Sequence, residues 1–301
     1  VCTSLLLVTL MGNRLLWHRN TLAFLNVGQG DCAVLTTYDH RAIVIDGGGK
    51  HNKELGENTG VTILEPYLAS KGVTQIDAVF LSHLDGDHST GILELLDDMP
   101  VEGIYVSAMK AADAQMDEQL QEIVEKNQIS LYTMKHGDMI HSTALGEMTC
   151  LFPIYEDKAA ESENERSLVL RYAYGDTSVL FTGDLEAKEE LLLERNNLIE
   201  ETDILKVSHH GSKTASTESF LQALTPDTAV ISCGANNLYG HPHKEVLERL
   251  SACGAEILRT DEMGSIVVTI SPEGEAEVTT AAERKPIYER IKEAMEGTPI
   301  P

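Results

Sequence analysis

The chain has 301 residues, of which 42% are hydrophobic and 24% are charged, a composition typical of a packed globular protein and not of a disordered one. Lys and Arg total 23 against 48 Asp and Glu, which gives a formal net charge of −25. This balance excludes a general basic surface for nucleic acid, so a polyanionic partner would have to be held locally, by metal ions or by a confined basic patch.

The first 20 residues form an apolar leader, VCTSLLLVTLMGNRLLWHRN. Its uninterrupted apolar part ends before Arg14 and is shorter than the roughly 20 residues that span a bilayer. Because Arg14, Trp17 and Arg19 follow it, as at a membrane interface, we interpret residues 1–20 as the end of a transmembrane helix. An ordinary first strand or helix is the alternative.

From residue 21 onward, β-rich segments alternate with helical ones. Strands are predicted over 22–28, 31–38, 41–49 and 77–82, with helices over 58–72 and 91–99. After an acidic segment at 156–166, predicted to be a mobile loop, strands at 178–184, 203–212 and 228–234 alternate with helices at 185–196, 216–224 and 244–254. The apolar strands predict an α/β fold with sheets covered on their faces. We expect one domain over residues 21–271 and a peripheral tail over 272–301, which contains an amphipathic helix.

Histidines and carboxylates recur where predicted strands end, the usual place for reactive groups on a rigid scaffold. Taken singly, each is more often a turn or surface residue. Together, neutral imidazoles and ionised carboxylates are the donors that divalent metals bind, which predicts a two-metal site with one bridging carboxylate. The residues are His83, Asp85, Asp87 and His88 in SHLDGDHSTG, Asp184 in TGD, His209 and His210 in SHHGS, and His241 and His243 in GHPH.

The order HxDxDH, TGD, HHGS, GHP resembles the metallo-β-lactamase superfamily. The fuller strings NVGQGDCAVL, VIDGGG, LKVSHHGSKTAS and NNLYGHPH resemble the C-terminal hydrolase domain of the ComEC-type competence DNA-uptake channels, over about residues 21–271. The resemblance implies an αββα sandwich with a two-metal site along one edge. It also implies a metal-dependent deoxyribonuclease on the extracytoplasmic face of a bacterial cell membrane, which degrades one strand of incoming DNA during natural competence.

The same resemblance implies single-stranded DNA as substrate, a membrane channel part of the same or a longer protein as partner, and no organic cofactor. The superfamily's usual string is HxHxDH, with a third histidine before the TGD aspartate. Here Asp85 replaces the second histidine and Asn164 stands near the place of the third. Oxygen donors favour harder ions, so we expect two divalent ions with Mn²⁺ preferred and Zn²⁺ or Mg²⁺ as alternatives.

Roles in catalysis follow from the types of side chain. We assign His83 and Asp85 to one metal, Asp87 and His88 to the other, and Asp184 to the bridge. One of His209 and His210 would complete the coordination, and the sequence leaves open which one, because neighbours on a strand point in opposite directions.

Three further groups are candidates for catalysis. His210 could act there instead of as a ligand, and His241 is either the last ligand or a general acid that protonates the departing 3′ oxygen. Lys213, with Ser212, could meet a phosphate together with the first amides of the helix at 216–224. Asp31 and Asp46 are expected to orient ligands or tight turns.

Other functions remain open at this stage. The same site could hydrolyse an extracytoplasmic phosphodiester of the cell envelope, such as a phosphocholine ester, although Trp17 is the only tryptophan and no aromatic box for choline is evident. Asp85 argues against a β-lactamase. A non-catalytic, DNA-guiding domain is disfavoured by the number of retained metal-binding residues.

Overall fold

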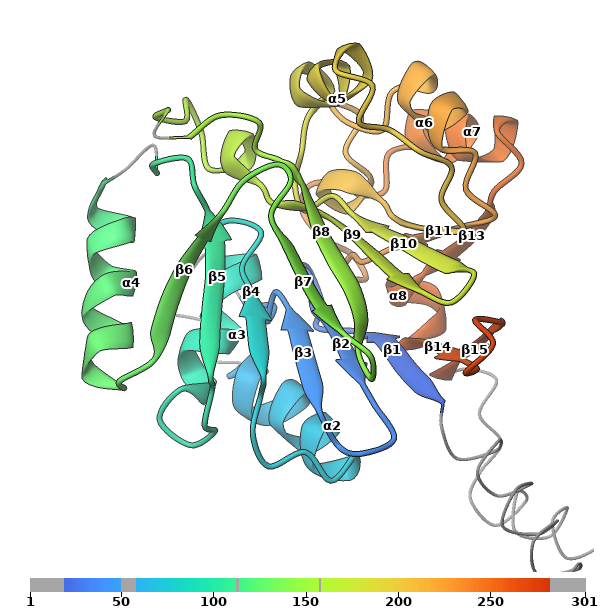
Figure 1. The fold of residues 1–301 in the computed structure, drawn as a ribbon. Coiled ribbons are helices and arrows are strands. Elements are labelled where there is room, and N and C mark those ends of the chain that lie inside the picture. Colours follow the sequence, from blue (N-terminus) through green and yellow to red (C-terminus); the bar gives the residue numbers. More distant parts are fainter. Residues whose placement is uncertain (1–18, 50–57, 112–113, 157, 282–301) are drawn as a thin grey trace, which may run out of the picture.

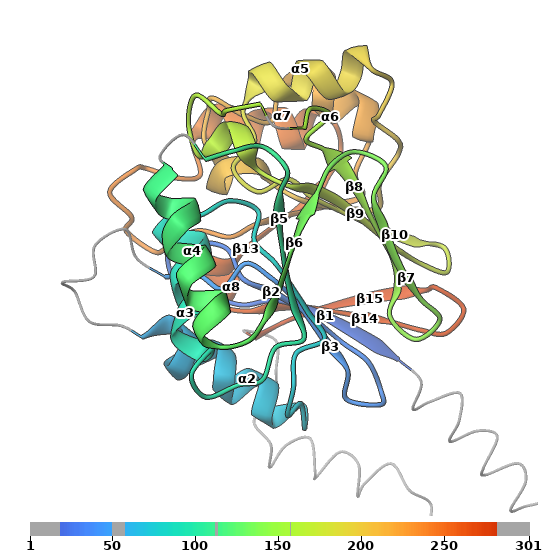
Figure 2. The ribbon, with the colours of Figure 1, turned by 60° about the vertical axis from the view of Figure 1, so that its left-hand side comes forward.

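Two mixed β-sheets lie face to face, with helices on both outer faces, as the turned views in Figures 1 and 2 show. The computed structural model describes residues 19–49, 58–111, 114–156 and 158–281. This arrangement confirms the predicted αββα sandwich. Almost all of the predicted leader and the amphipathic part of the tail lie outside the described residues.

The first sheet has eight strands, which are, in spatial order, β15 (Ala276–Thr280), β14 (Ile266–Ile270), β1 (Asn20–Phe24), β2 (Ala33–Thr36), β3 (Ala42–Ile45), β4 (Ala78–Phe80), β5 (Gly103–Ser107) and β6 (Ser130–Met134). The second sheet has seven strands, which are β13 (Glu256–Arg259), β12 (Thr228–Ile231), β11 (Ile204–Lys206), β10 (Thr177–Phe181), β9 (Val169–Tyr174), β8 (Gly146–Phe152) and β7 (Met139–Ser142). The sheet thus continues through β15, beyond the domain boundary that we expected at residue 271.

Helices cover each sheet on its outer side (Figure 2). The first sheet carries the π-helical turn η2 (Gly60–Leu64) with α2 (Glu65–Ser70), then α3 (Gly86–Leu95) and α4 (Ala114–Lys126); the second carries α5 (Ala187–Arg195), α6 (Glu218–Leu224) and α7 (Lys244–Ala252). The short helix α8 (Thr260–Met263) joins β13 to β14 and thereby connects the two sheets. Among the described helices, none has the length and apolar character needed to cross a bilayer.

Three apolar layers hold the sandwich together. The central layer lies between the sheets and contains Phe24, Phe80 and Phe181, all nearly inaccessible to solvent. Leu68 of α2 belongs to the layer under the first sheet's helices, and Leu193 of α5 to the layer under the second sheet's helices. Strands buried on both faces explain why the sequence shows continuous apolar runs and little alternation.

Both sheets contain a parallel half. Strands β3 to β6 pair in parallel in the first sheet, and β10 to β13 in the second. The carboxyl ends of parallel strands meet at one edge, and loops there are the usual carriers of reactive side chains. The histidine and aspartate loops follow β4, β10, β11 and β12 at this edge.

The acidic segment at 156–166 is not a free surface loop. It ends in the 3₁₀ turn η3 (Asn164–Arg166), where Glu165 and Arg166 are buried. Glu165 Oε1 lies 2.8 Å from Lys158 Nζ and 3.0 Å from Lys188 Nζ. Arg166 pairs with Asp117 of α4 at 2.8 Å. Internal ion pairs, which composition does not reveal, fix this segment.

We predict that this anchoring weakens in acid. Burial opposes ionisation of Glu165, but hydrogen bonds from Lys158, the Glu161 amide and Lys188 outweigh it and lower the pKa of Glu165 from 4.5 to about 2. The resulting stabilisation is complete above pH 4.5 and disappears as the pH falls through about 2. The wild type should therefore have a larger free energy of unfolding than Glu165→Gln, and this difference should shrink as the pH falls. Chemical denaturation of both proteins at several pH values measures it.

The matched control is Glu161→Gln, whose side chain is 81% exposed and also faces Lys188. Its effect should be small at every pH, because exposed ion pairs contribute little. A pH-independent difference between wild type and Glu165→Gln would contradict the account.

Candidate metal centre

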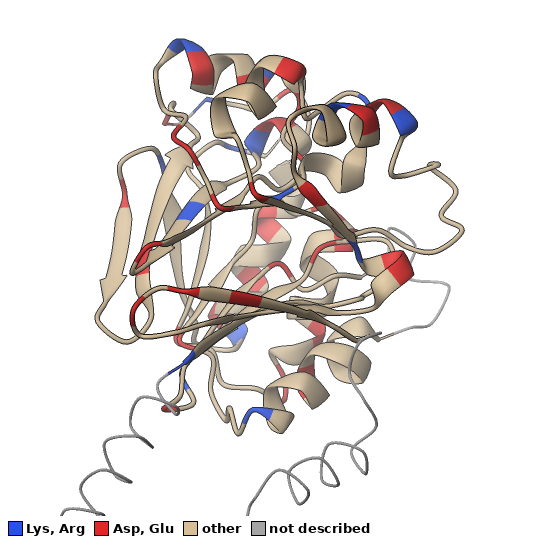
Figure 3. Cartoon of the chain, turned by 90° about the vertical axis from the view of Figure 1, so that its right-hand side faces the viewer, with Lys and Arg blue, Asp and Glu red and all other residues tan. Residues whose placement is uncertain are grey.

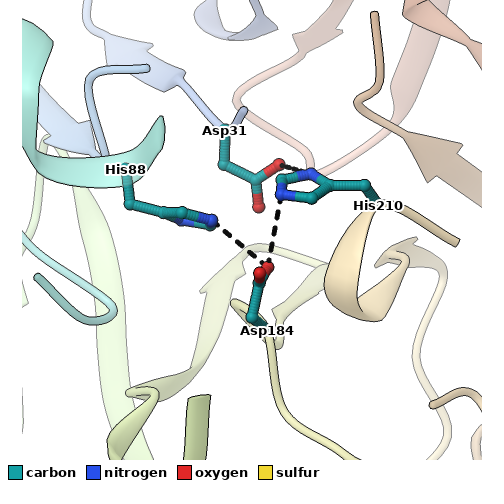
Figure 4. Close-up of side chains that lie close together, drawn as sticks. All are labelled: Asp31, His88, Asp184 and His210. Carbon is teal, nitrogen blue, oxygen red and sulfur yellow. Dashed lines mark ion pairs between the residues drawn. The ribbon is translucent and has the colours of Figure 1, made fainter. Parts of the chain in front are cut away.

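The carboxylate of Asp184, which follows β10, lies at the centre of the histidine cluster. Its Oδ1 is 3.2 Å from His88 Nε2 and 3.6 Å from His210 Nε2. Its Oδ2 is 3.6 Å from His209 Nε2 and 4.0 Å from His83 Nε2. The two oxygens of one buried side chain therefore face two different pairs of imidazoles, one pair of which is drawn in Figure 4.

Two further carboxylates complete two groups of donors. Asp85 Oδ2 lies 3.6 Å from His83 Nε2, and Asp87 Oδ2 lies 3.4 Å from His210 Nε2. We call His83, Asp85, Asp184 and His209 the first quartet, and Asp87, His88, Asp184 and His210 the second quartet. Each quartet offers two imidazole nitrogens and two carboxylates, and Asp184 belongs to both.

The adjacent histidines enter different quartets because the backbone bends sharply at η4 (Ser208–Gly211). His209 has φ 47° and His210 has φ 53°, in the left-handed region, which costs on the order of 1 kcal/mol or more for each non-glycine residue. The His209 amide donates to the Gly183 carbonyl at 3.0 Å, and the His209 carbonyl accepts from the Ser212 amide at 2.8 Å. The bend turns both rings toward Asp184, whereas on a straight strand they would point apart.

Buried donor atoms without partners indicate that the quartets suit metal ions. Among the described residues, the Nε2 atoms of His83, His88 and His210 and the Oδ1 atom of Asp184 are shielded from solvent and have no hydrogen-bond partner. Such burial is costly unless something else satisfies these atoms. With ligand bonds of about 2.1 Å, two donors of a tetrahedral site lie roughly 3.4 Å apart. The donor separations are 3.2, 3.4 and 3.6 Å in the second quartet and 3.6, 3.6 and 4.0 Å in the first, so the second quartet is the closer match.

The second ring nitrogen of these histidines is already occupied. His88 Nδ1 lies 2.9 Å from Asp46 Oδ2, and His83 Nδ1 lies 3.0 Å from Ser82 Oγ. His210 Nδ1 donates to the Ser232 carbonyl at 3.0 Å. This pattern, with Nδ1 fixed by the protein and Nε2 free, is typical of histidines that bind metals through Nε2.

A buried ion pair supports the second quartet from behind. Asp31 Oδ2 lies 2.6 Å from Lys206 Nζ, and Asp31 Oδ1 lies 3.1 Å from His210 Nδ1 (Figure 4). Asp31 Oδ2 is thus paired with Lys206, whereas Oδ1 is buried without a hydrogen-bond partner among the described residues, and Asp31, His88, Asp184 and His210 each offer a donor atom within 4.8 Å of the others. Asp31 can therefore orient His210 and is also a candidate ligand of the second site. Our sequence reasoning did not single out Lys206, although a lysine inside the apolar run DILKV was a usable signal.

The carboxylates give the centre a strong attraction for positive charge. Burial opposes protonation of His210, but Asp184 and Asp31 outweigh it and raise its pKa to about 10. Burial likewise opposes protonation of His88, yet Asp184 and Asp46 hold its pKa well above the ordinary value. Burial opposes ionisation of Asp184, while His210 and His88 keep its pKa well below the ordinary value.

An open pocket exposes the quartets to solvent. Its lining includes Asp85, Asp87, Asp184, His209 and His210, and beyond the quartets Gln29, Asn164, Tyr239 and His241. The ring of His241 lies 5.6 Å from that of His209 and 6.2 Å from that of His210. Burial, and to a smaller extent the charge of nearby His210, lowers the pKa of His241 to about 4. Asn164, near the place of the superfamily's third histidine, thus faces the same pocket.

Two of the predicted phosphate contacts are not at this pocket. Lys213 is exposed and does not line the pocket, and its amide donates to His243 Nδ1 at 3.2 Å. The amides of Ser216 and Thr217, at the start of α6, donate to the Glu190 carboxylate at 2.5 and 2.8 Å. A phosphate cannot use these amides, so that part of the prediction is wrong. Glu190 lies on α5, and no local sequence pattern indicates that its carboxylate meets the amides before α6.

Residues 25–235 match the Metallo-beta-lactamase superfamily. The chain belongs to this superfamily. Its fold is also similar to CmlA, a diiron β-hydroxylase from Streptomyces venezuelae, with a TM-score of 0.55 and 13% identity over 84% of this chain and 54% of that one.

Competence proteins are among the relatives of this chain. It is 34% identical to ComE operon protein 3 of Bacillus subtilis, over 80% of this chain and 32% of the relative. It is 31% identical to Recombination protein 2 of Haemophilus influenzae, over 84% of this chain and 29% of the relative. It is also 31% identical to Competence protein ComA of Neisseria gonorrhoeae, over 80% of this chain and 31% of the relative. The predicted family resemblance is confirmed, and the chain spans about a third of the length of these relatives.

We predict that Asp31 is needed for stability even without metal. Asp31→Asn would leave the Lys206 ammonium buried without a carboxylate, which should lower the free energy of unfolding of the metal-stripped protein by about 3 kcal/mol. Urea denaturation measures this. The double variant Asp31→Asn/Lys206→Met, which removes both charges, should recover much of the loss. A loss below about 0.5 kcal/mol in the single variant would contradict the role of the pair.

Proposed function

We propose that this chain is a metal-dependent deoxyribonuclease that acts on incoming DNA during natural competence and degrades one strand during uptake. The observation that carries the proposal is the pair of quartets that share Asp184. Two adjacent sites joined by one carboxylate are the arrangement used to hydrolyse phosphodiesters. The competence proteins among the relatives support DNA as the substrate.

We propose that the first quartet holds one divalent ion and the second quartet the other, with Asp184 as the bridge. When bound, such ions supply Lewis acidity and a water of lowered pKa for attack on phosphorus. The protein's part is to fix the ligands: Asp46 and Ser232 hold His88 and His210 in the required orientation. Because its lowered pKa keeps His241 neutral near pH 7, that ring fits the role of a further ligand better than that of a general acid.

The acidic character of the chain makes these ions essential for binding DNA. Figure 3 shows Asp and Glu positions distributed over many helices, strands and loops of the described chain, and the net charge of −25 repels phosphates at long range. Two dications would add about four positive charges at the pocket itself. Affinity for DNA should therefore depend on the metal and not on a basic surface.

We further propose that the domain works on the extracytoplasmic face of a bacterial membrane, next to a channel part of the same or a longer protein. Support comes from the relatives, of which this chain matches about a third. Single-stranded DNA is the proposed substrate.

Hydrolysis of end-labelled DNA tests the activity. Metal-stripped protein resupplied with Mn²⁺ should cleave the strand. Asp87→Ala should reduce kcat/KM by more than the roughly 10- to 100-fold loss typical of changes in supporting residues, because it removes a ligand. If the wild type binds metal but cleaves no DNA and instead hydrolyses a phosphocholine diester, the envelope phosphodiesterase is correct.

Metal preference is expected to depend on Asp85. The wild type should turn over faster with Mn²⁺ than with Zn²⁺, since each quartet contains two carboxylates. Asp85→His gives the first quartet a third imidazole, so the ratio of Mn²⁺ to Zn²⁺ activity should fall by roughly tenfold or more. Metal titrations of both proteins measure this ratio, and an equal ratio would show that Asp85 does not set the preference.

A further inference from the structure

The loop between β12 and α7 holds two apolar side chains out into solvent beside the pocket. Leu238 is 100% exposed and Tyr239 is 54% exposed. A fully exposed leucine gains none of the free energy that burial of its side chain would provide. Exposed apolar groups at the rim of a pocket are a frequent sign of a binding surface.

Asn237 holds this loop in its extended position. Its Oδ1 accepts hydrogen bonds from the amides of Tyr239 and His241 at 3.1 and 3.0 Å. Its Nδ2 donates to the carbonyls of Gly234 and His241 at 2.9 and 2.6 Å. One side chain thus satisfies four backbone groups, and Leu238 and Tyr239 are presented on a fixed turn.

Tyr239 continues the row of rings that leads out of the metal centre. Its ring is stacked on His241, with centroids 5.6 Å apart and planes at 24°. His241 in turn meets His209 of the first quartet edge to face, with centroids 5.6 Å apart. The same pocket is lined by Tyr239 and by Asp184. A flat ligand on Tyr239 would therefore lie at the same pocket as the carboxylate of Asp184.

We propose that the ring of Tyr239 forms the stacking surface for an unpaired nucleobase next to the scissile phosphate; this rests on the proposed nuclease function. Stacking does not require positive charge and tolerates any base, which suits a chain with a net charge of −25. A base inside a duplex already stacks on both neighbours and cannot use this surface. The loop therefore selects single-stranded DNA.

The test compares the full chain with Mn²⁺ on a single-stranded oligonucleotide and on one of equal length built from abasic tetrahydrofuran residues. The wild type should show a kcat/KM about tenfold or more higher for the strand with bases. In Tyr239→Ala this ratio should fall close to one, while Tyr239→Phe, which keeps the ring, should retain it. Thermal melting monitors folding of each variant.

Tyr132→Ala is the matched control, because Tyr132 is 47% exposed on β6 and does not line the pocket. Its ratio should equal that of the wild type. If Tyr239→Ala keeps the wild-type ratio, the stacking surface is wrong although the nuclease stands. If the wild type cleaves neither strand, the proposed nuclease function itself fails.

Discussion

The carboxylate of Asp184 is the interaction on which the centre depends. It is buried among four imidazoles that come from two segments, the one after β4 and the one after β11, and each of its oxygens faces two of them. Such a group needs compensating positive charge, and the raised pKa of His210 shows how strongly that charge is attracted. The parallel halves of both sheets bring these segments to the same edge of the sandwich, so the position of the metal centre depends on the strand order of the fold.

Backbone strain and tight packing maintain that arrangement. His209 and His210 are held in left-handed conformations, which residues other than glycine adopt only rarely. On the opposite side, the Gly91 amide of α3 donates to the Gly48 carbonyl at 2.8 Å, and a Cβ on Gly91 would lie 2.0 Å from the Gly47 carbonyl oxygen. The first turn of α3, with Asp87 and His88, is therefore fixed against the strand end that carries Asp46. Strain at functional sites of this kind is affordable because packing elsewhere stabilises it.

Local patterns predicted much of this structure. The apolar segments predicted an α/β fold with covered sheets, and the resemblance to the metallo-β-lactamase superfamily implied the sandwich. The spacing in HLDGDH placed four donors together because they sit on one strand end and one helical turn. Contacts between distant segments were not predictable. No local pattern indicates that Lys206 pairs with Asp31, or that Glu190 occupies the amides before α6. The direction of two neighbouring rings, at His209 and His210, depends on a backbone bend that residue types alone do not specify.

We propose that the adjacent histidines His209 and His210 bind different ions, and the metal content of the protein measures this most directly. Elemental analysis of protein reconstituted with Mn²⁺ should find two ions per chain in the wild type. His209→Ala and His210→Ala should each retain one, because each removes a ligand from a different quartet. Loss of both ions in one variant with no loss in the other would contradict the division, and would mean that only one of the two histidines is a ligand.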